Sequence, residues 1–585
     1  MQQEMLEREE IANRKKHWVR AVTACSSRCI FCLDMDTPRN VFLEVDDVKA
    51  ELARGREELD ADKVIISGGE ATLHPKFPEM ITYARSIGYE RVQTVTNGWK
   101  FADKDFYRRC MKAGLGEITF SLHGHTAQLH DRLTRHPGSF KRLLKGMIRA
   151  VRDPYGPIVN VDVVINKQNV PYLDKIIALC SSLGVYEFDL LHVIPQSEAF
   201  RQRDQLFYDV LEHKEVLHKV FRLNQHPRFV IWTNRFPISY LEGLEDLIQD
   251  PHKMLDEVNG RRYQVRRYID TGNTLDCRQP ERCKHCFIES FCTTMERTIE
   301  TQNQNKLDVW YGSVDKGIPF GASRRGLTVQ DASQIPDGIP LEIRSDAAFP
   351  LCKPEQDIRW IAKTAAQLSS WLENLPANQS MEIELNRETA AWMLQNKVLI
   401  QNKSEQLTIH QPSYEKMKQA VENDVENPRS FFDSLDQPIR SSGLPICLLG
   451  PAKWTKKNTR LYEHMFKEGR LQSDRLAKNH IEEHYFGKSE RCRDCVYTTR
   501  CDGLHINMIR AQGLALLNPQ SEQTQPLPPQ KIRILNGAKP QVAAPSLPGF
   551  APPKEPPRDP LAILAEEREK QKEERRALRM AKRDQ

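Results

Sequence analysis

Long apolar runs and a strong net charge are both missing from this sequence of 585 residues. No stretch of about 18 apolar residues occurs, so we expect no transmembrane helix. The first residues, 1–16, are rich in charge and lack the apolar stretch of a signal peptide. The formal net charge is only +6, which is too small at this length to indicate nucleic-acid binding. These absences predict a cytoplasmic protein and argue against a membrane or nucleic-acid partner.

Cysteine is what the chain does contain, with fourteen residues, nine of them in three tight motifs. Where no signal peptide is evident, closely spaced thiols indicate metal binding in a reducing compartment rather than disulfides. Hydrophobic residues make up 39% of the chain, enough for real cores, and the length predicts about two to four domains.

Between residues 17 and 200, short β-rich apolar runs alternate with amphipathic stretches. This alternation is typical of parallel strands joined by right-handed helical crossovers. Six strand–helix units predict an α/β fold shaped as a partial barrel, with ligands at the carboxyl ends of its strands. The predicted strands are 18–23, 63–67, 91–96, 117–122, 158–165 and 187–194, and the predicted helices are 45–58, 76–87, 103–113, 139–152 and 170–183.

The most informative motif follows the first predicted strand, where Cys25, Cys29 and Cys32 have the spacing C-x3-C-x2-C. Three thiolates can hold three corners of a 4Fe–4S cluster and leave the fourth iron without a protein ligand. Phe31 lies directly before the third cysteine, where an aromatic ring can shield such a cluster. We expect these cysteines to be both metal ligands and the catalytic centre.

This motif, with the strand before it and the motifs after it, resembles the radical S-adenosylmethionine (radical SAM) superfamily. The resemblance implies a partial (β/α)6 barrel over 17–200. It also implies that the open iron binds S-adenosylmethionine (SAM) and cleaves it reductively to a 5′-deoxyadenosyl radical, which takes hydrogen from a substrate. An electron donor such as flavodoxin or ferredoxin is implied as a partner.

The same resemblance assigns SAM contacts to residues at successive strand ends. The segment with Gly68, Gly69 and Glu70 would meet the amino group of SAM, and the Thr96–Gly98 turn with Asn97 would line the site. The remaining implied contacts are Ser121 for the ribose or carboxylate, Asn166 for the ribose, and Ile194 for adenine. His123 and His125 are candidates for substrate binding or for loop packing, and Arg135 is a candidate partner of the SAM carboxylate.

Two further cysteine motifs share the spacing C-x2-C-x5-C, one at Cys283, Cys286 and Cys292 and the other at Cys492, Cys495 and Cys501. Both follow Glu-Arg, and a Pro-Ile pair precedes each by 46 or 47 residues, which suggests a duplicated unit. The motifs resemble the core of SPASM and twitch extensions, which bind auxiliary 4Fe–4S clusters, but both lack the C-x3-C continuation of SPASM.

Each motif then needs a fourth ligand. Cys277 is the candidate for the first and Cys447 for the second. Ser239 stands where the repeat aligns with Cys447, so the modules could have exchanged ligands. Tetrahedral zinc remains an alternative to iron and sulfur at either module.

The sequence therefore predicts six segments along the chain. Two α+β cysteine modules are expected to follow the barrel, and then a segment rich in proline and a helical tail of mixed charge. The expected boundaries are 1–16 for a leader segment, 17–200, 201–345, 346–515, 516–560 for the linker and 561–585 for the tail.

The leading functional hypothesis is a radical SAM enzyme that modifies a peptide or protein, with auxiliary clusters accepting electrons. A cofactor or small-molecule biosynthesis enzyme is the first alternative. An RNA-modifying enzyme, gripping phosphates through its basic loops, is a second. A non-catalytic iron–sulfur scaffold would predict a degraded SAM site, whereas Gly68, Gly69 and Glu70 are intact.

Overall fold

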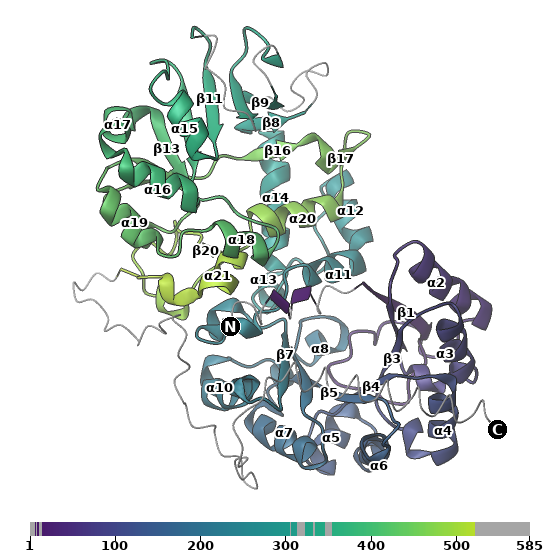
Figure 1. Cartoon of the computed structure of the whole chain (residues 1–585). Coiled ribbons are helices and arrows are strands. Elements are labelled where there is room, and N and C mark those ends of the chain that lie inside the picture. Colours follow the sequence, from purple (N-terminus) through teal and green to yellow (C-terminus); the bar gives the residue numbers. More distant parts are fainter. Residues whose placement is uncertain are drawn as a thin grey trace, which may run out of the picture. The chain divides into compact units, whose positions relative to one another are not determined.

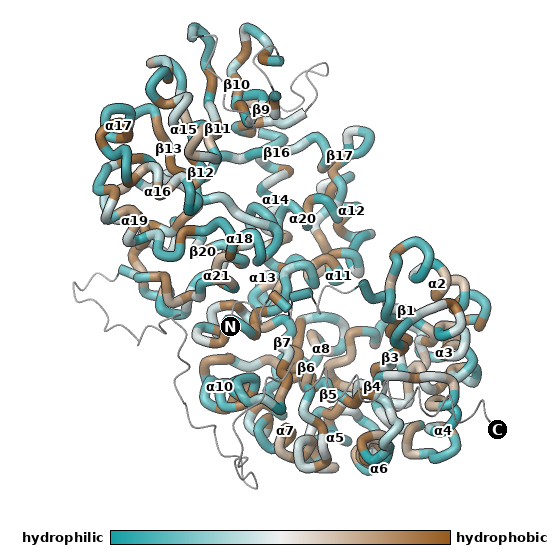
Figure 2. Tube along the Cα trace, viewed as in Figure 1, coloured by the Kyte–Doolittle hydropathy of each residue, from teal (hydrophilic) through white to brown (hydrophobic). Residues whose placement is uncertain are grey.

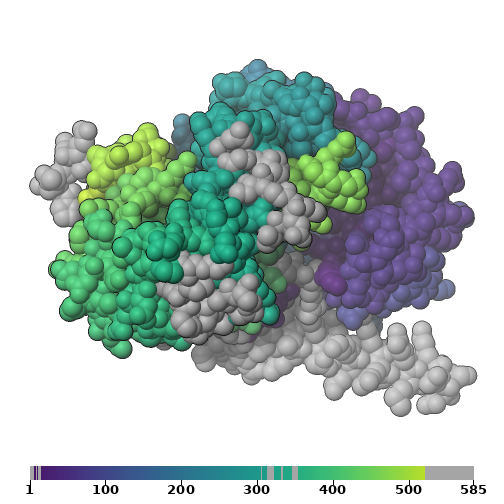
Figure 3. Space-filling view, turned by 90° about the horizontal axis from the view of Figure 1, so that it is seen from above, coloured from purple at the N-terminus to yellow at the C-terminus, as the bar shows by residue number. Residues whose placement is uncertain are grey.

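The computed structural model describes residues 6–7, 9–10, 15–304, 306–312, 322–330, 334–345 and 354–520. The chain divides into two compact units. The barrel unit contains Asn13–Phe236, and the second unit combines Met1–Ala12 with Pro237–Ile534. In Figures 1 and 3 the barrel unit is coloured purple to blue and the second unit teal to yellow, except for the first residues of the chain, which are purple. The predicted linker and tail lie almost entirely outside the described residues.

The barrel unit is built on one parallel sheet whose seven strands follow one another in chain order. Helices pack along the outside of this sheet (Figure 1). The strands are β1 (Lys16–Val22), β2 (Lys63–Gly68), β3 (Arg91–Thr96), β4 (Glu117–Ser121), β5 (Ile158–Ile165), β6 (Glu187–His192) and β7 (Val230–Asn234). The main helices are α2 (Val45–Glu57), α3 (Phe77–Ser86), α4 (Lys104–Ala113), α5 (Ala127–Thr134), α6 (Ser139–Arg152), α7 (Leu173–Ser182) and α10 (Lys214–Phe221).

This architecture confirms the predicted α/β partial barrel and all six predicted strands. β7 is a seventh strand that lies beyond the predicted boundary at residue 200. It pairs with β6 in parallel. The sequence pattern missed β7 because short helical turns, rather than one amphipathic helix, fill most of the connection from β6.

The two faces of the barrel strands differ in chemistry. Side chains that point toward the helices are apolar and fully buried, as Ile118 and Phe120 of β4 are. Those on the other face are polar or partly exposed, as Asp162 of β5 and Asp189 of β6 are. The apolar residues of each unit gather on its strands and on the inner sides of its helices (Figure 2). Burial of this apolar face is the main term that stabilises the barrel.

Helix ends in the barrel unit follow from local sequence. Asp103 caps α4, because its carboxylate accepts hydrogen bonds from the backbone N–H groups of Asp105 and Phe106 at 2.9 and 2.8 Å. Gly114 ends the same helix with a φ of 99°, which an L side chain rarely adopts. No helix in the described ranges is long and apolar enough to cross a membrane.

The second unit contains a parallel sheet of nine strands. Eight of them, from β8 to β15, are neighbours in chain order, and β16 pairs with β8 at the opposite edge. The strands are β8 (Val309–Tyr311), β9 (Arg324–Val329), β10 (Leu341–Ser345), β11 (Ile358–Ala362), β12 (Ser380–Glu384), β13 (Leu407–His410), β14 (Arg440–Ser442), β15 (Lys453–Trp454) and β16 (Arg460–Tyr462).

This sheet differs from the two α+β modules that we expected. The expected boundary at 345/346 falls between β10 and β11, which are hydrogen-bonded neighbours. The sheet also curls strongly, because Arg460 on β16 lies 2.9 Å from Glu382 on β12 although four strands stand between them. The strands of this sheet are two to six residues long and several carry charges, so alternation alone did not reveal them.

Helices flank both ends of this sheet in sequence. Those before it are α11 (Lys253–Gly260), α12 (Arg262–Thr271), α13 (Pro280–Cys283) and α14 (Glu289–Asn303). Those between its strands and after it are α15 (Ala365–Trp371), α16 (Arg387–Gln395), α17 (Lys397–Asn402), α18 (Met417–Asn423), α19 (Pro428–Leu435), α20 (Ser473–Glu483) and α21 (Ile506–Gln512). The first cysteine motif therefore lies in α13 and α14, and the second between α20 and α21.

Candidate functional site

The loop after β1 carries the three cysteines of the C-x3-C-x2-C motif. The backbone N–H of Cys32 donates to the carbonyl of Cys29 at 3.1 Å, and the backbone N–H of Ser27 donates to the Cys25 sulfur at 3.4 Å. The Cys25 and Cys32 thiols are close enough to Cys29 to act on it electrostatically. One turn of chain therefore presents three sulfurs together at the carboxyl end of the first strand.

Burial makes the Cys25 and Cys29 thiols hold their protons when no metal is bound. Burial and the nearby Glu70 together raise the pKa of Cys25 to about 11. Burial and the two neighbouring thiols raise the pKa of Cys29 as well. Thiolates are the metal-binding form, so a bound metal would displace protons from this loop.

Gly68 and Gly69 let the end of β2 pack against this cysteine loop. A Cβ on Gly68 would lie 2.1 Å from the carbonyl oxygen of Val22, and one on Gly69 would lie 2.4 Å from those of Thr23 and Ala24. The backbone N–H of Gly69 donates to Val22 at 3.0 Å. The glycines thus serve a close approach of two backbone segments, in addition to any approach to a ligand.

Glu70 is buried and its carboxylate joins the ends of β2 and β3. Its oxygens accept hydrogen bonds from the Thr96 hydroxyl at 2.8 Å, from the backbone N–H of Asn97 at 2.7 Å, and from the backbone and hydroxyl of Thr72. Burial raises the pKa of Glu70, and these hydrogen bonds oppose that effect. Glu70 therefore positions the strand ends around the cysteine loop.

Asn97 connects that carboxylate to the cysteine loop. Its side-chain amide donates to the Ser26 hydroxyl at 3.0 Å and lies 3.4 Å from that of Ser27. The Ser27 hydroxyl also lies 3.3 Å from Nδ1 of His136. These contacts fix the chain between Cys25 and Cys29.

Phe31 and His123 pack on each other beside the loop, with ring centroids 4.6 Å apart and nearly perpendicular planes. The Nδ1 atom of His123 accepts from the backbone N–H of Val164 at 3.2 Å, which ties β4 to β5. Burial and the neighbouring His130 lower the pKa of His123, so this ring is neutral. His123 is therefore a packing residue behind Phe31.

His125 differs from His123. Its Nδ1 atom is buried without a hydrogen-bond partner, and its ring lies 5.1 Å from that of Tyr172. Burial and Lys175 lower the pKa of His125.

Arg135 donates to Glu198 at 2.9 Å, so its guanidinium already has a carboxylate partner.

The other predicted SAM contacts lie at strand ends, as expected. The Asn166 side chain is fully buried, donates to the carbonyl of Val164 at 3.0 Å and accepts from the backbone N–H of Gln168 at 3.0 Å. The Ile194 carbonyl accepts from Gln196 at 2.9 Å. Ser121 donates to the carboxyl group of Asp162.

Asp162 and Asp189 are site residues that the sequence did not reveal. They are paired neighbours on β5 and β6 and point to the polar face of the sheet. The Asp189 carboxylate accepts from Asn234, whereas one oxygen of Asp162 is buried without a partner. Burial raises the pKa of Asp162 to about 7, and the charge of Asp189 adds to this effect. The alternation of apolar and polar residues from Val159 to Val163 in β5 was the sequence signal for Asp162.

Arg39 is a second residue missed from the sequence. Its guanidinium lies 3.8 Å from the Cys32 sulfur and 3.5 Å from that of Met35, and it also donates to the carbonyl of Ser27. A cation at this distance stabilises thiolate and the negative charge of a ligated cluster.

Residues 19–180 match the radical SAM superfamily. This chain therefore contains a radical SAM domain. It is 28% identical over 213 residues to a probable GTP 3′,8-cyclase of Saccharolobus islandicus (strain L.S.2.15 / Lassen #1), covering 35% of this chain and 68% of the relative. It is also 26% identical over 154 residues to the AdoMet-dependent heme synthase of Oleidesulfovibrio alaskensis, covering 26% of this chain and 38% of the relative.

Among solved structures, Streptococcus suis SuiB bound to the precursor peptide SuiA is similar with a TM-score of 0.33 and 14% identity. The alignment covers 42% of this chain and 55% of SuiB, so the chain spans about half of that structure's length. Native anSMEcpe with bound AdoMet and the Kp18Cys peptide has a TM-score of 0.31 and 12% identity, with 45% and 68% covered. These scores are too low to indicate a shared substrate.

The match of residues 19–180 to the radical SAM superfamily implies a 4Fe–4S cluster and SAM. The donor set of the radical SAM domain fits this cluster, since three partly buried thiols share one loop and Arg39 lies beside the Cys32 sulfur. The thiols of Cys25, Cys29 and Cys32 would hold the cluster, while Glu70 and Asn97 would keep the loop and the strand ends in place.

The second unit brings the first auxiliary motif together as predicted from spacing. The thiols of Cys277, Cys283 and Cys292 all lie close enough to Cys286 to interact electrostatically with it or with one another. Arg278 donates to the Cys283 sulfur at 3.4 Å, and apolar residues such as Phe291 and Met295 surround the group. Burial raises the pKa of Cys292 to about 12.

The second auxiliary motif has the same composition of four thiols. Cys447 lies within electrostatic reach of Cys492, Cys495 and Cys501, and burial raises its pKa to about 11. The backbone N–H groups of Asn518 and Gln520 donate to the sulfurs of Cys447 and Cys495, each at 3.4 Å. All four of these cysteines are partly exposed.

Ser239 does not lie with the motif that it precedes in sequence. Its hydroxyl donates to Glu490, two residues before Cys492, at 2.8 Å. The segments around Ser239 and Cys447 both form a short 3-10 turn after a proline. No group of three or more His, Cys, Asp or Glu side chains in the described ranges converges on the position of a single metal ion.

Proposed function

We propose that this radical SAM enzyme binds a 4Fe–4S cluster through Cys25, Cys29 and Cys32 and uses SAM to remove a hydrogen atom from its substrate. The cluster would supply the electron that cleaves SAM. A flavodoxin or ferredoxin would donate that electron to the cluster. The observation that carries this proposal is the set of three partly buried thiols on one loop at the carboxyl end of β1. That is the edge at which parallel barrels bind their ligands.

Anaerobic reconstitution tests this reaction. Reconstituted protein with dithionite and SAM should form 5′-deoxyadenosine, and Cys29→Ala should abolish it. Cys110→Ala is the matched control, because Cys110 is a buried thiol of the same unit outside the site. Absence of 5′-deoxyadenosine from protein that carries its full iron would contradict the proposed reaction.

The two groups of four thiols in the second unit support two auxiliary 4Fe–4S clusters. With four protein ligands each, they would be closed and would serve electron transfer, so that an oxidised product can form after hydrogen removal. Three clusters correspond to about twelve iron atoms per chain. Iron near four per chain together with stoichiometric zinc would instead support the zinc alternative.

Cys495→Ala separates the auxiliary role from SAM cleavage. We expect this variant to keep 5′-deoxyadenosine formation in part and to lose product formation. It should also lose about one third of the iron of the wild-type chain. Unchanged iron would show that the second module holds no cluster.

Two substrate classes follow from different observations. The auxiliary cysteine motifs support modification of a peptide or protein, which is our first candidate. The relatives by sequence support the second candidate, since a GTP 3′,8-cyclase and a heme synthase are named for small-molecule products. The polar barrel face with Asp162 and Asp189 suits hydrogen-bond donors or cationic groups of either kind of substrate.

Fractionated cell extract distinguishes these classes. Ultrafiltration separates small molecules from macromolecules, and each fraction is added to reconstituted protein while 5′-deoxyadenosine formation is followed. If the macromolecular fraction stimulates the reaction and protease treatment abolishes this stimulation, a peptide or protein substrate is supported. Stimulation by the filtrate would support a small molecule, and loss after ribonuclease treatment would support RNA.

A further inference from the structure

A pocket opens at the carboxyl ends of strands in the second unit. It has a volume of about 610 Å³ and is lined by Tyr311, Gly312, Thr328, Arg344, Tyr462, Glu463 and His464. These residues come from the last positions of β8, β9, β10 and β16 or directly follow them. Parallel α/β sheets bind ligands at this edge, where loops leave the strands.

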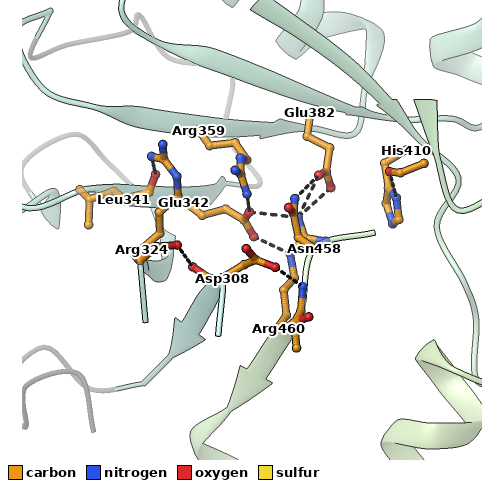
Figure 4. A network of polar contacts seen from close by, with 12 residues as sticks. Asp308, Arg324, Leu341, Glu342, Arg359, Glu382, His410, Asn458 and Arg460 are labelled. Carbon is orange, nitrogen blue, oxygen red and sulfur yellow. Dashed lines mark hydrogen bonds and ion pairs between the residues drawn. The ribbon is translucent and has the colours of Figure 1, made fainter. Parts of the chain in front are cut away.

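The layer below the pocket is a closed network of paired charges (Figure 4). Glu342 accepts from Arg460 at 2.7 and 3.0 Å and from Arg359 at 3.1 Å. Arg460 also donates to Glu382 at 2.9 and 3.0 Å, and the Tyr311 hydroxyl donates to Glu342 at 2.8 Å. Two arginines thus meet two carboxylates, and this layer needs no ligand.

Arg344 lies two residues after Glu342 on the same face of β10, and its guanidinium is left largely unpaired. Nη2 donates to the Tyr462 hydroxyl at 3.4 Å, and Nε is buried without a partner. The guanidinium lies over the ring of Tyr311 at 4.6 Å. Among the described residues it forms no ion pair. An arginine side chain carries five N–H donors, so most of the donors of this pocket-lining residue have no acceptor among the described residues.

A buried cation without a counter-charge is costly for a folded protein, and such cost is typical of a binding site. Two acidic groups that interact electrostatically with Arg344, Glu384 and Glu482, do not remove this cost. Burial raises the pKa of Glu384, and burial together with Glu483 raises the pKa of Glu482 to about 7. Neither approaches Arg344 closely enough for an ion pair. An oxyanion in the pocket would satisfy the guanidinium with paired hydrogen bonds.

Aromatic rings form the wall beside this cation. Tyr311 and Tyr462 stack with centroids 5.2 Å apart at 22°, and Tyr462 and His464 stack at 5.5 Å and 29°. Such a wall favours a planar group on the ligand. We propose that the pocket binds a small organic anion, with its carboxylate or phosphate paired to Arg344 and its planar part against Tyr462 and His464. This site is separate from the cluster chemistry proposed above and does not depend on it.

Four probes test both halves of this proposal by calorimetric titration of the full-length reconstituted protein. Acetate and benzoate carry a carboxylate without and with a ring, and inorganic phosphate and phenyl phosphate do the same for a phosphate. We expect benzoate and phenyl phosphate to bind about tenfold more tightly than acetate and inorganic phosphate. Tighter binding of the carboxylates or of the phosphates identifies which of these groups the natural ligand carries. Failure of all four probes to bind would overturn the proposal, and equal binding with and without the ring would overturn the stacking.

Arg344→Gln and Arg324→Gln form a matched pair of variants. Arg324 is the first residue of β9, at the amino end of the strand and away from the pocket, and it is paired with Asp357 at 2.8 Å. Arg344→Gln should weaken binding by about tenfold or more, whereas Arg324→Gln should leave it unchanged. Equal binding by wild type and Arg344→Gln would overturn the assignment of Arg344.

Stability separates a binding role from a structural one. Because Arg344 is unpaired, Arg344→Gln without ligand should unfold at the same urea concentration as wild type or a higher one. A marked fall in that midpoint would mean that Arg344 supports the fold instead. If Arg344→Gln fails to fold, Arg344→Lys is the substitute, because it keeps the positive charge and loses the paired N–H donors of the guanidinium. This variant should bind the probes more weakly than wild type and should unfold at the wild-type urea midpoint. Formation of 5′-deoxyadenosine should be unaffected in each variant.

Discussion

At the scale of single residues, the barrel joins structural and chemical roles in the same side chains. Glu70 matches a motif position that the resemblance assigns to SAM, and its carboxylate also holds two strand ends through hydrogen bonds from Thr72, Thr96 and Asn97. His123 has a packing role behind Phe31. A motif residue can therefore act on a cofactor through the shape that it gives to the loop around it.

Asp162 should make the stability of the protein depend on pH. Its pKa is about 7 in the folded chain against an ordinary value of 3.8, because it is buried and lies beside Asp189. The folded state therefore binds this proton more tightly than the unfolded state, and the free energy of unfolding falls as pH rises from about 4 to 7. Asp162→Asn imitates the protonated form and should be more stable than wild type by about 2 kcal/mol at pH 8.

Urea unfolding at about pH 5 and pH 8 measures this difference. Asp204→Asn is the control, since the Asp204 side chain is 92% exposed and its substitution should not change the pH dependence. An equal pH dependence in wild type and Asp162→Asn would contradict the burial of an ionisable group at this position.

At the scale of elements, the turn after β2 shows how tightly the cysteine loop is constrained. Gly69→Ala would place a Cβ 2.4 Å from two carbonyl oxygens of the chain that leads into Cys25. We expect displacement of that loop, a loss of bound iron and a fall in 5′-deoxyadenosine formation of about a hundredfold.

Gly138→Ala is the control for Gly69→Ala. Gly138 has a φ of 80° but no atom within 4 Å of an added Cβ, so its substitution carries only the conformational cost of about 1 kcal/mol. Iron content near the wild-type value in Gly69→Ala would show that the loop can move aside without losing its ligands.

At the scale of the whole molecule, the second unit is discontinuous in sequence. Glu9, from the start of the chain, is buried and pairs with Arg510 of α21 at 3.1 Å. Arg510 also donates a hydrogen bond to the Asn507 side chain at 2.9 Å and lies 3.9 Å from the Asp250 carboxylate. Residues that precede the barrel therefore complete a unit built by residues that follow it.

Glu9→Ala should destabilise the second unit by about 1–3 kcal/mol, because it removes one partner of a buried cation. Glu10→Ala is a control at the next position, where the side chain is exposed. Urea unfolding and limited proteolysis of the region around α21 measure the effect. A wild-type midpoint in Glu9→Ala would show that Asp250 and Asn507 suffice for Arg510.

Much of the barrel could be predicted because its signals are local. Strands such as 91–96 and 158–165 carry β-branched residues, and their ends match those of β3 and β5. The carboxyl ends of consecutive parallel strands meet at one edge, so the order of the motifs along the chain also places them together. β7 and the strands of the second sheet have weaker sequence patterns, because these strands are short, partly charged and joined by irregular segments.

The sequence by itself determined the three groups of cysteines, the six-strand start of the barrel and the radical SAM motifs within residues 19–180. Spacings of two to five residues limit how far apart thiols can lie, whatever the rest of the chain does. Only the tertiary structure decided what depends on distant pairing. It placed Asp162 beside Asp189, Glu9 against Arg510, and Arg344 above a paired layer of charges without an ion-pair partner among the described residues. Strand order and sheet curvature bring these residues together, and no local pattern in the chain records those contacts.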